Sequence, residues 1–248
     1  MTAYFYQDLA YLLGGFFLVG LAAGYSFIKK PCLLLIALTM LLSVAGITDL
    51  LFRYNSDPTV LLLSEAANVA CYCYALTIFL HFSLVYFFRQ PSLGGAAYSW
   101  WLYQPALVLI LLHVISPWMI GGVTSGANAC QIDYRPGYWA IVAFGLIYLA
   151  LIGGLNLQIV ALSQSVKERE RSLYLMFAVG LTAFYYASAL ILPFVYGTVN
   201  FSSPLPLTCA ALILVYACYR YGFFIGKEEW PGTAILIDHG QRAGIAKG

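Results

Sequence analysis

The sequence predicts an all-α integral membrane protein, a bundle of seven transmembrane helices with its N-terminus outside and its C-terminus in the cytoplasm. Of its 248 residues, 62% are hydrophobic and only 9% are charged. That is more apolar surface than one soluble core of this size can bury. Apolar stretches about 20 residues long, enough to cross a bilayer, recur along the chain. We therefore expect a multi-pass protein of a cell inner membrane, with the lipid bilayer as its first partner.

Seven apolar stretches alternate with connections that carry charged residues, proline or glycine. Each stretch is long enough to form a spanning helix, and most connections are short enough to make neighbouring helices antiparallel. In order, the predicted spans cover residues 9–28, 32–52, 60–88, 98–119, 138–163, 172–196 and 204–224. The chain thus divides into a transmembrane domain, residues 1–224, and a short cytoplasmic tail, residues 225–248.

Lysine and arginine indicate the orientation of these spans. If seven helices alternate, ten of the twelve basic residues lie on one side, and only Arg53 and Arg135 lie on the other. Cytoplasmic loops are enriched in Lys and Arg, so the richer side is predicted to be cytoplasmic. The longest outer connection, residues 120–137, has no strong period. We expect it to be a passive loop, or else a lid over an outward-facing pocket.

Charged and polar residues gather in the outer halves of the second and third spans. Asp49 and Arg53 are four residues apart, which places them on one helix face. Glu65 lies at a similar depth in the next span, followed at helical spacing by Asn68 and Tyr72. Ionisable groups within a membrane are costly and commonly functional. These five residues are the candidate site for a small-molecule ligand. The alternative is that Arg53 neutralises Asp49 and Glu65 and locks the two helices together.

The remaining polar residues do not assemble into a catalytic or cofactor site. His81 and His113 fall at different depths, so they cannot share one haem, and we expect hydrogen-bonded structural roles for both. The sequence contains no CxxC pair, no nucleophile with a matching base and no phosphate-binding loop. It also lacks a basic stripe for nucleic acid. We expect no enzymatic activity, no cofactor, no metal and no nucleic-acid partner.

Four segments carry a family resemblance: ACYCYALTIFLHFSLVYFFRQ (residues 70–90), WLYQPALVLILLHVISP (101–117), SVKERERSLYLMFAVGL (165–181) and LILVYACYRYGFF (212–224). In order and spacing they resemble the seven-helix N-terminal sensor region of bacterial histidine kinases, over nearly the whole membrane part. The resemblance implies an input module that passes a signal to cytoplasmic domains. Only 24 residues (Ile225–Gly248) follow the last predicted span, however, and they contain no dimerisation helix and no nucleotide-binding domain.

The leading interpretation is therefore a non-catalytic sensory or signalling module that acts through membrane or cytoplasmic partner proteins. A structural or accessory subunit of a larger membrane complex is the alternative, and a small-solute transporter ranks third. The tail supplies the candidate docking residues. Lys227 and Trp230 lie at the predicted membrane edge, and Ile235 and Ile237 belong to a short strand-like run that could pair with a partner's sheet.

Overall fold

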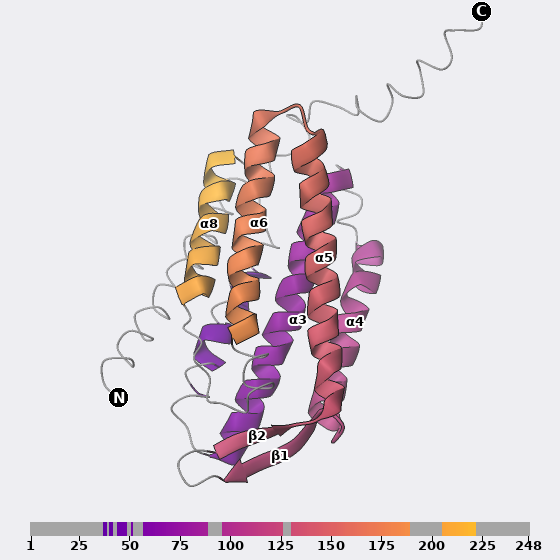
Figure 1. Ribbon diagram of the computed structural model, residues 1–248, viewed down its shortest axis with the longest axis vertical. Coiled ribbons are helices and arrows are strands. Elements are labelled where there is room, and N and C mark those ends of the chain that lie inside the picture. Colours follow the sequence, from indigo (N-terminus) through magenta and orange to yellow (C-terminus); the bar gives the residue numbers. More distant parts are fainter. Residues whose placement is uncertain are drawn as a thin grey trace, which may run out of the picture.

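The computed structural model describes residues 37–38, 40–41, 44–48, 51, 57–88, 96–125, 130–188 and 205–221. Over these residues the chain is mostly helical, and its helices pack side by side as a bundle (Figure 1). The α-helices are α3 (Pro58–Phe88), α4 (Ala96–Ile115), α5 (Trp139–Leu162), α6 (Val166–Tyr186) and α8 (Leu205–Tyr221). A short 3-10 helix, η2 (Pro136–Tyr138), leads directly into α5.

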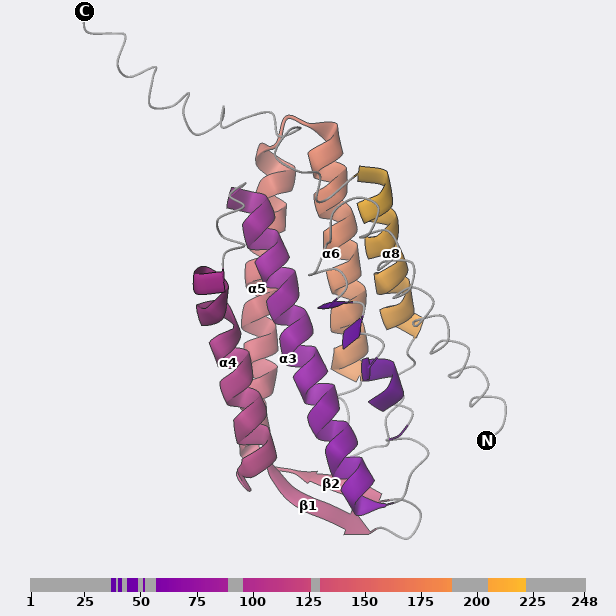
Figure 2. The same ribbon diagram turned by 180° about the vertical axis from the view of Figure 1, so that it is seen from behind.

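Successive described helices run in opposite directions along the bundle (Figures 1 and 2). α3 packs against α4 and α5, and α6 packs against α5 and α8. The first turn of α3 is capped by Asp57, whose Oδ1 accepts the backbone N–H of Thr59 at 2.8 Å. The spans predicted at residues 60–88, 98–119 and 138–163 correspond closely to α3, α4 and α5. α6 begins six residues earlier than the predicted span, because the charged run 167–171 is itself helical.

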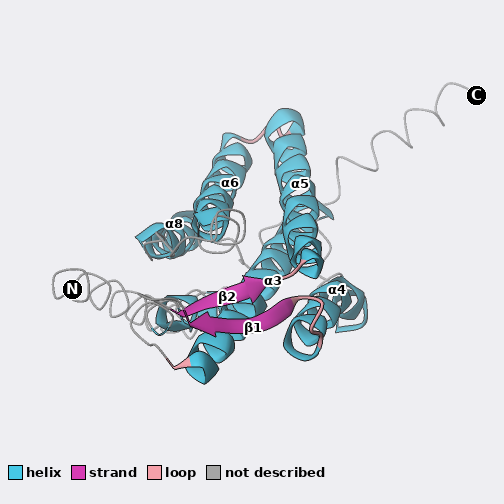
Figure 3. Cartoon of the chain, turned by 60° about the horizontal axis from the view of Figure 1, so that its bottom comes forward, coloured by secondary structure: helices cyan, strands magenta, loops and turns pink. Residues whose placement is uncertain are grey.

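The long connection, which the sequence suggested was a loop without a strong period, contains a β-hairpin. β1 (Ile120–Ser125) pairs antiparallel with β2 (Cys130–Tyr134), and Val123 lies opposite Ile132. The fold is therefore helical with an added hairpin rather than purely all-α. The register shifts at Gly122, whose φ of 133° is a backbone conformation that glycine adopts without strain. Figure 3 shows the two strands lying across the end of the bundle at which α3 begins.

Two stretches are long and apolar enough to cross a membrane, Pro58–His81 and Pro136–Leu162, with mean hydropathies of 1.4 and 2.2. A buried core helix passes the same test, so the exposure of each stretch matters. α3 is buried over most of its length. α5 turns Ile141 and Ile152 inward, yet it also exposes Leu146 and Ile147. A helix that is apolar on all sides suits a position between a protein core and lipid.

Candidate functional site

Glu65 is the centre of the most unusual polar arrangement in the described part of the chain. The carboxylate lies on α3 and is 2% exposed. Tyr138 donates its hydroxyl to Glu65 Oε1 at 3.0 Å, and the Tyr134 hydroxyl also hydrogen-bonds to Glu65. Burying a carboxylate is costly unless hydrogen bonds satisfy it. The two tyrosines supply such bonds from a segment far along the chain, and their rings pack at 4.6 Å.

Both tyrosines belong to the continuous segment that runs from β2 through η2 into α5. Backbone hydrogen bonds fix this segment against the residues that precede β1: the Arg135 N–H donates to Met119 O (3.0 Å), and the Gly137 N–H donates to Trp118 O (3.2 Å). A side chain at residue 137 would collide with the Trp118 ring, so only glycine permits this approach. The hairpin, the start of α5 and Glu65 therefore form one connected unit.

This arrangement favours the protonated form of Tyr134. Burial, followed by the negative charge of Glu65 and the hydrogen bond to it, raises the pKa of Tyr134 well above its ordinary value. The hydroxyl therefore remains a proton donor at physiological pH. Since the raised pKa favours the protonated form, this contribution is present below the unfolded-state pKa and is lost only as the pH rises through the folded-state pKa.

Asn68 and Tyr72 continue the buried polar face of α3 beyond Glu65. Asn68 is 3% exposed, and its Oδ1 has no hydrogen-bond partner among the described residues. The Tyr72 ring packs 4.6 Å from the ring of Tyr186 on α6, and its hydroxyl lies directly against Gly145 on α5. Within the part of the chain that the structure describes, the buried Tyr186 hydroxyl also has no hydrogen-bond partner. The helical spacing thus places Glu65, Asn68 and Tyr72 on one buried face, and α5 and α6 close over it.

The two histidines differ in their surroundings. His81 Nδ1 lies 3.3 Å from the Tyr103 hydroxyl, so the expected hydrogen-bonded role is confirmed for His81. Among the described residues, neither ring nitrogen of His113 has a hydrogen-bond partner, so a hydrogen-bonded role for His113 stays a prediction. Its ring instead packs against Tyr138, with the centroids 5.9 Å apart. This apolar contact places His113 beside the Glu65 unit but leaves it outside the hydrogen bonds there.

A second polar cluster joins three helices nearer the other end of the bundle, and sequence reasoning missed it. Asn156 on α5 donates to Ser83 Oγ on α3 at 2.8 Å and accepts from Ser172 Oγ on α6 at 3.2 Å. All three side chains are completely buried. The available signal was the amide of Asn156 in a span whose only other amide side chain is Gln158. The three buried side chains satisfy one another's hydrogen bonds, so the cluster links the three helices.

Several candidate residues lie outside the described residues: Asp49, Arg53, Lys227, Trp230, Ile235 and Ile237. Among the residues that the structure does describe, no group of three or more His, Cys, Asp or Glu side chains could hold a metal ion. Cys71 and Cys73 are buried free thiols on α3. The described chemistry is therefore that of a buried carboxylate with tyrosine donors.

No protein-family model matches the sequence, and no curated protein matches it at a significant level. The resemblance to histidine-kinase sensor regions therefore rests on the sequence segments themselves, and the site has to be interpreted from its own geometry.

Proposed function

We propose that this chain is a seven-span protein of a cell inner membrane that serves as a non-catalytic sensory input module and acts through partner proteins. The observation that carries the proposal is the buried Glu65 carboxylate, which two tyrosines of the hairpin segment hold at one end of the bundle. A small molecule that competes for this carboxylate would displace the hairpin segment. Binding of the small molecule would thereby change the position of the hairpin segment.

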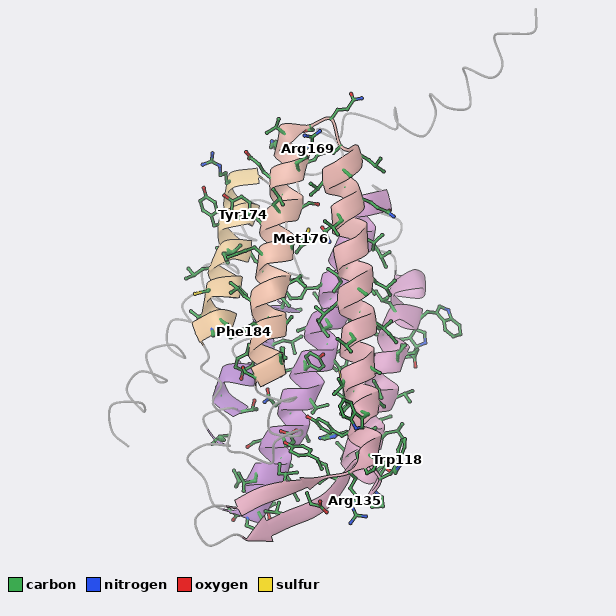
Figure 4. The ribbon with its side chains drawn as sticks, in the orientation of Figure 1. Trp118, Arg135, Arg169, Tyr174, Met176 and Phe184 are labelled. Carbon is green, nitrogen blue, oxygen red and sulfur yellow. The ribbon has the colours of Figure 1, made fainter. Side chains whose placement is uncertain are left out.

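The charges at the two ends of the bundle support an outward-facing site. Arg169 lies at the end formed by the α5–α6 turn, whereas Arg135 lies at the hairpin end (Figure 4). The described basic residues at the α5–α6 end are Lys167, Arg169, Arg171 and Arg220, whereas Arg135 at the hairpin end is accompanied by Asp133 and Asp57. By the positive-inside rule, this distribution of charge favours an outer position for the hairpin and Glu65.

α5 offers a route from the site to the cytoplasmic side. Tyr138 immediately precedes α5, so a displacement of this tyrosine moves the start of a continuous helix of 24 residues. Near its other end, α5 is joined to α6 by Asn156, and the Arg169 Nε–H donates to Ser163 O at 2.8 Å. A rigid helix with bonded contacts at both ends can carry a small shift between them. The expected output is a change at the α5–α6 turn, which a partner would detect.

A structural subunit of a larger membrane complex is the second candidate. Gly153 and Gly154 lie on α5 with open space where side chains would stand. Small residues of this kind allow another helix to approach closely in a membrane.

One purification distinguishes the two proposals. The full chain is isolated in a gentle detergent, as wild type and as Glu65→Gln, and the co-purifying proteins are quantified by mass spectrometry. A sensory module predicts a partner whose amount or cross-linking at the α5–α6 turn changes with Glu65→Gln. A stoichiometric partner that both forms retain equally would favour the subunit. Turnover of a substrate by the isolated chain would contradict both.

A further inference from the structure

We infer that Lys167, Arg171 and Arg220, where α6 begins and α8 ends, bind the phosphate group of an anionic phospholipid in the cytoplasmic leaflet. This site lies at the end of the bundle opposite the hairpin. The inference rests on the membrane orientation of the proposed function, but it does not depend on what Glu65 binds. It is drawn from basic residues that two helices bring together and from the apolar surface that continues from them.

Two tyrosine rings fix how α6 and α8 meet near this end. The two helices pack against each other and run in opposite directions (Figures 1 and 2). The rings of Tyr174 on α6 and Tyr216 on α8 pack with their centroids 5.7 Å apart. Arg220 follows Tyr216 by four residues, and its Nη1 group donates to the Tyr216 hydroxyl at 3.1 Å. Arg220 therefore lies about one helical turn beyond the ring pair, toward the end of the bundle.

The matching residues of α6 precede Tyr174, which lies near the end of the bundle marked by Arg169 (Figure 4). Lys167 and Arg171 are separated from each other and from Tyr174 by the i, i+4, i+7 spacing of one helix face. Because α6 runs opposite to α8, residues before Tyr174 lie on the same side of the ring pair as Arg220. Lys167 and Arg220 are exposed, and Arg171 is half-buried. Two helices thus place three cationic groups at one end of their seam.

The charge here stays positive after the acidic neighbours are counted. Glu170 comes four residues before Tyr174, so three cations and one carboxylate leave a formal charge of +2 among the described residues of this seam. Glu168 accepts the Ser163 hydroxyl, and Arg169 donates to Ser163 O, so these two side chains belong to the α5–α6 turn. Basic sites between helices on the cytoplasmic side of a membrane bind anionic lipid headgroups. Guanidinium groups suit phosphate in particular, because they can donate two parallel hydrogen bonds to it.

The surface next to the basic residues is apolar, which favours a lipid over a soluble anion. Leu212 precedes Tyr216 by one turn of α8, and the two side chains are 49% and 44% exposed. On α6, Leu173 and Phe177 are 53% and 63% exposed. Tyrosine is enriched where lipid headgroups meet the acyl chains. A phospholipid would contact both the cations and this apolar surface, whereas a free phosphate ion would gain nothing from the leucines and the phenylalanine.

Fluorescence anisotropy of a phosphatidylglycerol labelled on its acyl chain measures the binding directly. The full chain is held in a gentle detergent at neutral pH and constant ionic strength. We expect saturable binding that unlabelled phosphatidylglycerol displaces. Phosphatidylcholine has the same phosphate and chains but no net charge, and displacement by it should need a concentration roughly tenfold higher. Millimolar inorganic phosphate should leave the labelled lipid bound.

Matched variants test whether the binding comes from this seam. Lys167→Gln and Arg220→Gln each remove one cation, and each should raise the Kd for phosphatidylglycerol by about fivefold. Arg169→Gln removes one cation from the same end of the bundle but from the α5–α6 turn, so it should retain the wild-type Kd. Because two separate variants report on the seam, the test does not depend on the folding of either one alone.

Four results would each overturn the inference. They are no binding of phosphatidylglycerol, displacement by inorganic phosphate as effective as by phosphatidylglycerol, an unchanged Kd in both Lys167→Gln and Arg220→Gln, and a loss in Arg169→Gln equal to theirs. The second would identify a soluble anion as the ligand, and the last would show general charge attraction. None of them bears on the sensory role of Glu65, which the purification with Glu65→Gln tests separately.

Discussion

Tyr72 reaches its position because residue 145 has no side chain. The Tyr72 hydroxyl occupies the space that a Cβ at Gly145 would need, and its ring then packs on Tyr186. α3, α5 and α6 thus meet at one tyrosine, and the close approach of α5 depends on a glycine. Gly153, eight residues further along the same helix, faces open space. The two glycines therefore have opposite structural roles.

We predict opposite effects of alanine at these two positions. Gly145→Ala would force Tyr72 out of its place, and such overpacking costs about 1–3 kcal/mol of folding free energy. Gly153→Ala meets no neighbour and should be neutral or stabilise the helix by up to about 1 kcal/mol. Thermal unfolding of the two variants in one detergent measures the difference. Equal midpoints would show that Tyr72 does not occupy this space.

Tyr138 gives a second test at the scale of single residues. Tyr138→Phe removes the hydroxyl that Glu65 Oε1 accepts and leaves a buried carboxylate with one donor fewer. A hydrogen bond to a charged group contributes about 1.5–3 kcal/mol, so the variant should unfold at a clearly lower temperature. Tyr216→Phe is the control, because the Tyr216 hydroxyl accepts from the Arg220 Nη1 group at an exposed position. A loss no larger than that of the control would argue against a buried Glu65–Tyr138 bond.

Among the elements, the cluster centred on Asn156 holds α3, α5 and α6 together. Asn156→Leu would leave the buried Ser172 hydroxyl without its acceptor and Ser83 without its donor. We expect a loss of about 1–3 kcal/mol, the usual cost of leaving buried polar groups unsatisfied. Gln158→Leu removes a similar amide from the exposed face of the same helix and should have little effect. If both variants unfold alike, the amide of Asn156 does not join the helices.

The helices were easier to predict from sequence than the hairpin. α3, α4 and α5 follow from long apolar runs, and the 3.6-residue period alone places Glu65, Asn68 and Tyr72 on one face. The hairpin strands have only six and five residues and include two glycines, so no periodic signal stood out. In retrospect, the apolar Ile132 followed by the charged Asp133 is a short alternation typical of a strand, and the structure buries Ile132 and exposes Asp133.

The partners of Glu65 could not be predicted locally. Tyr138 lies 73 residues away in sequence and reaches the carboxylate only through the path of the hairpin segment. The sequence suggested Arg53 as a partner of Glu65, and because Arg53 lies outside the described residues that pairing stays a prediction. Asn156 and Ser83 are also 73 residues apart in sequence, and an amide in an apolar run does not indicate which residues it will contact. Contacts within one helix are therefore predictable, whereas contacts between distant helices require the fold.

For the whole molecule, the central claim is a membrane bundle whose hairpin end lies outside and whose α5–α6 turn lies in the cytoplasm. Two exposed positions report on these ends, Thr59 at the start of α3 and Gln164 in the turn. Each is changed to cysteine, and intact cells are treated with a membrane-impermeant thiol reagent before the labelled peptides are mapped by mass spectrometry. The account predicts that Thr59→Cys is labelled in intact cells and that Gln164→Cys is labelled only after the membrane is opened. Labelling of both positions from the same side, or of Gln164→Cys alone from outside, would contradict it.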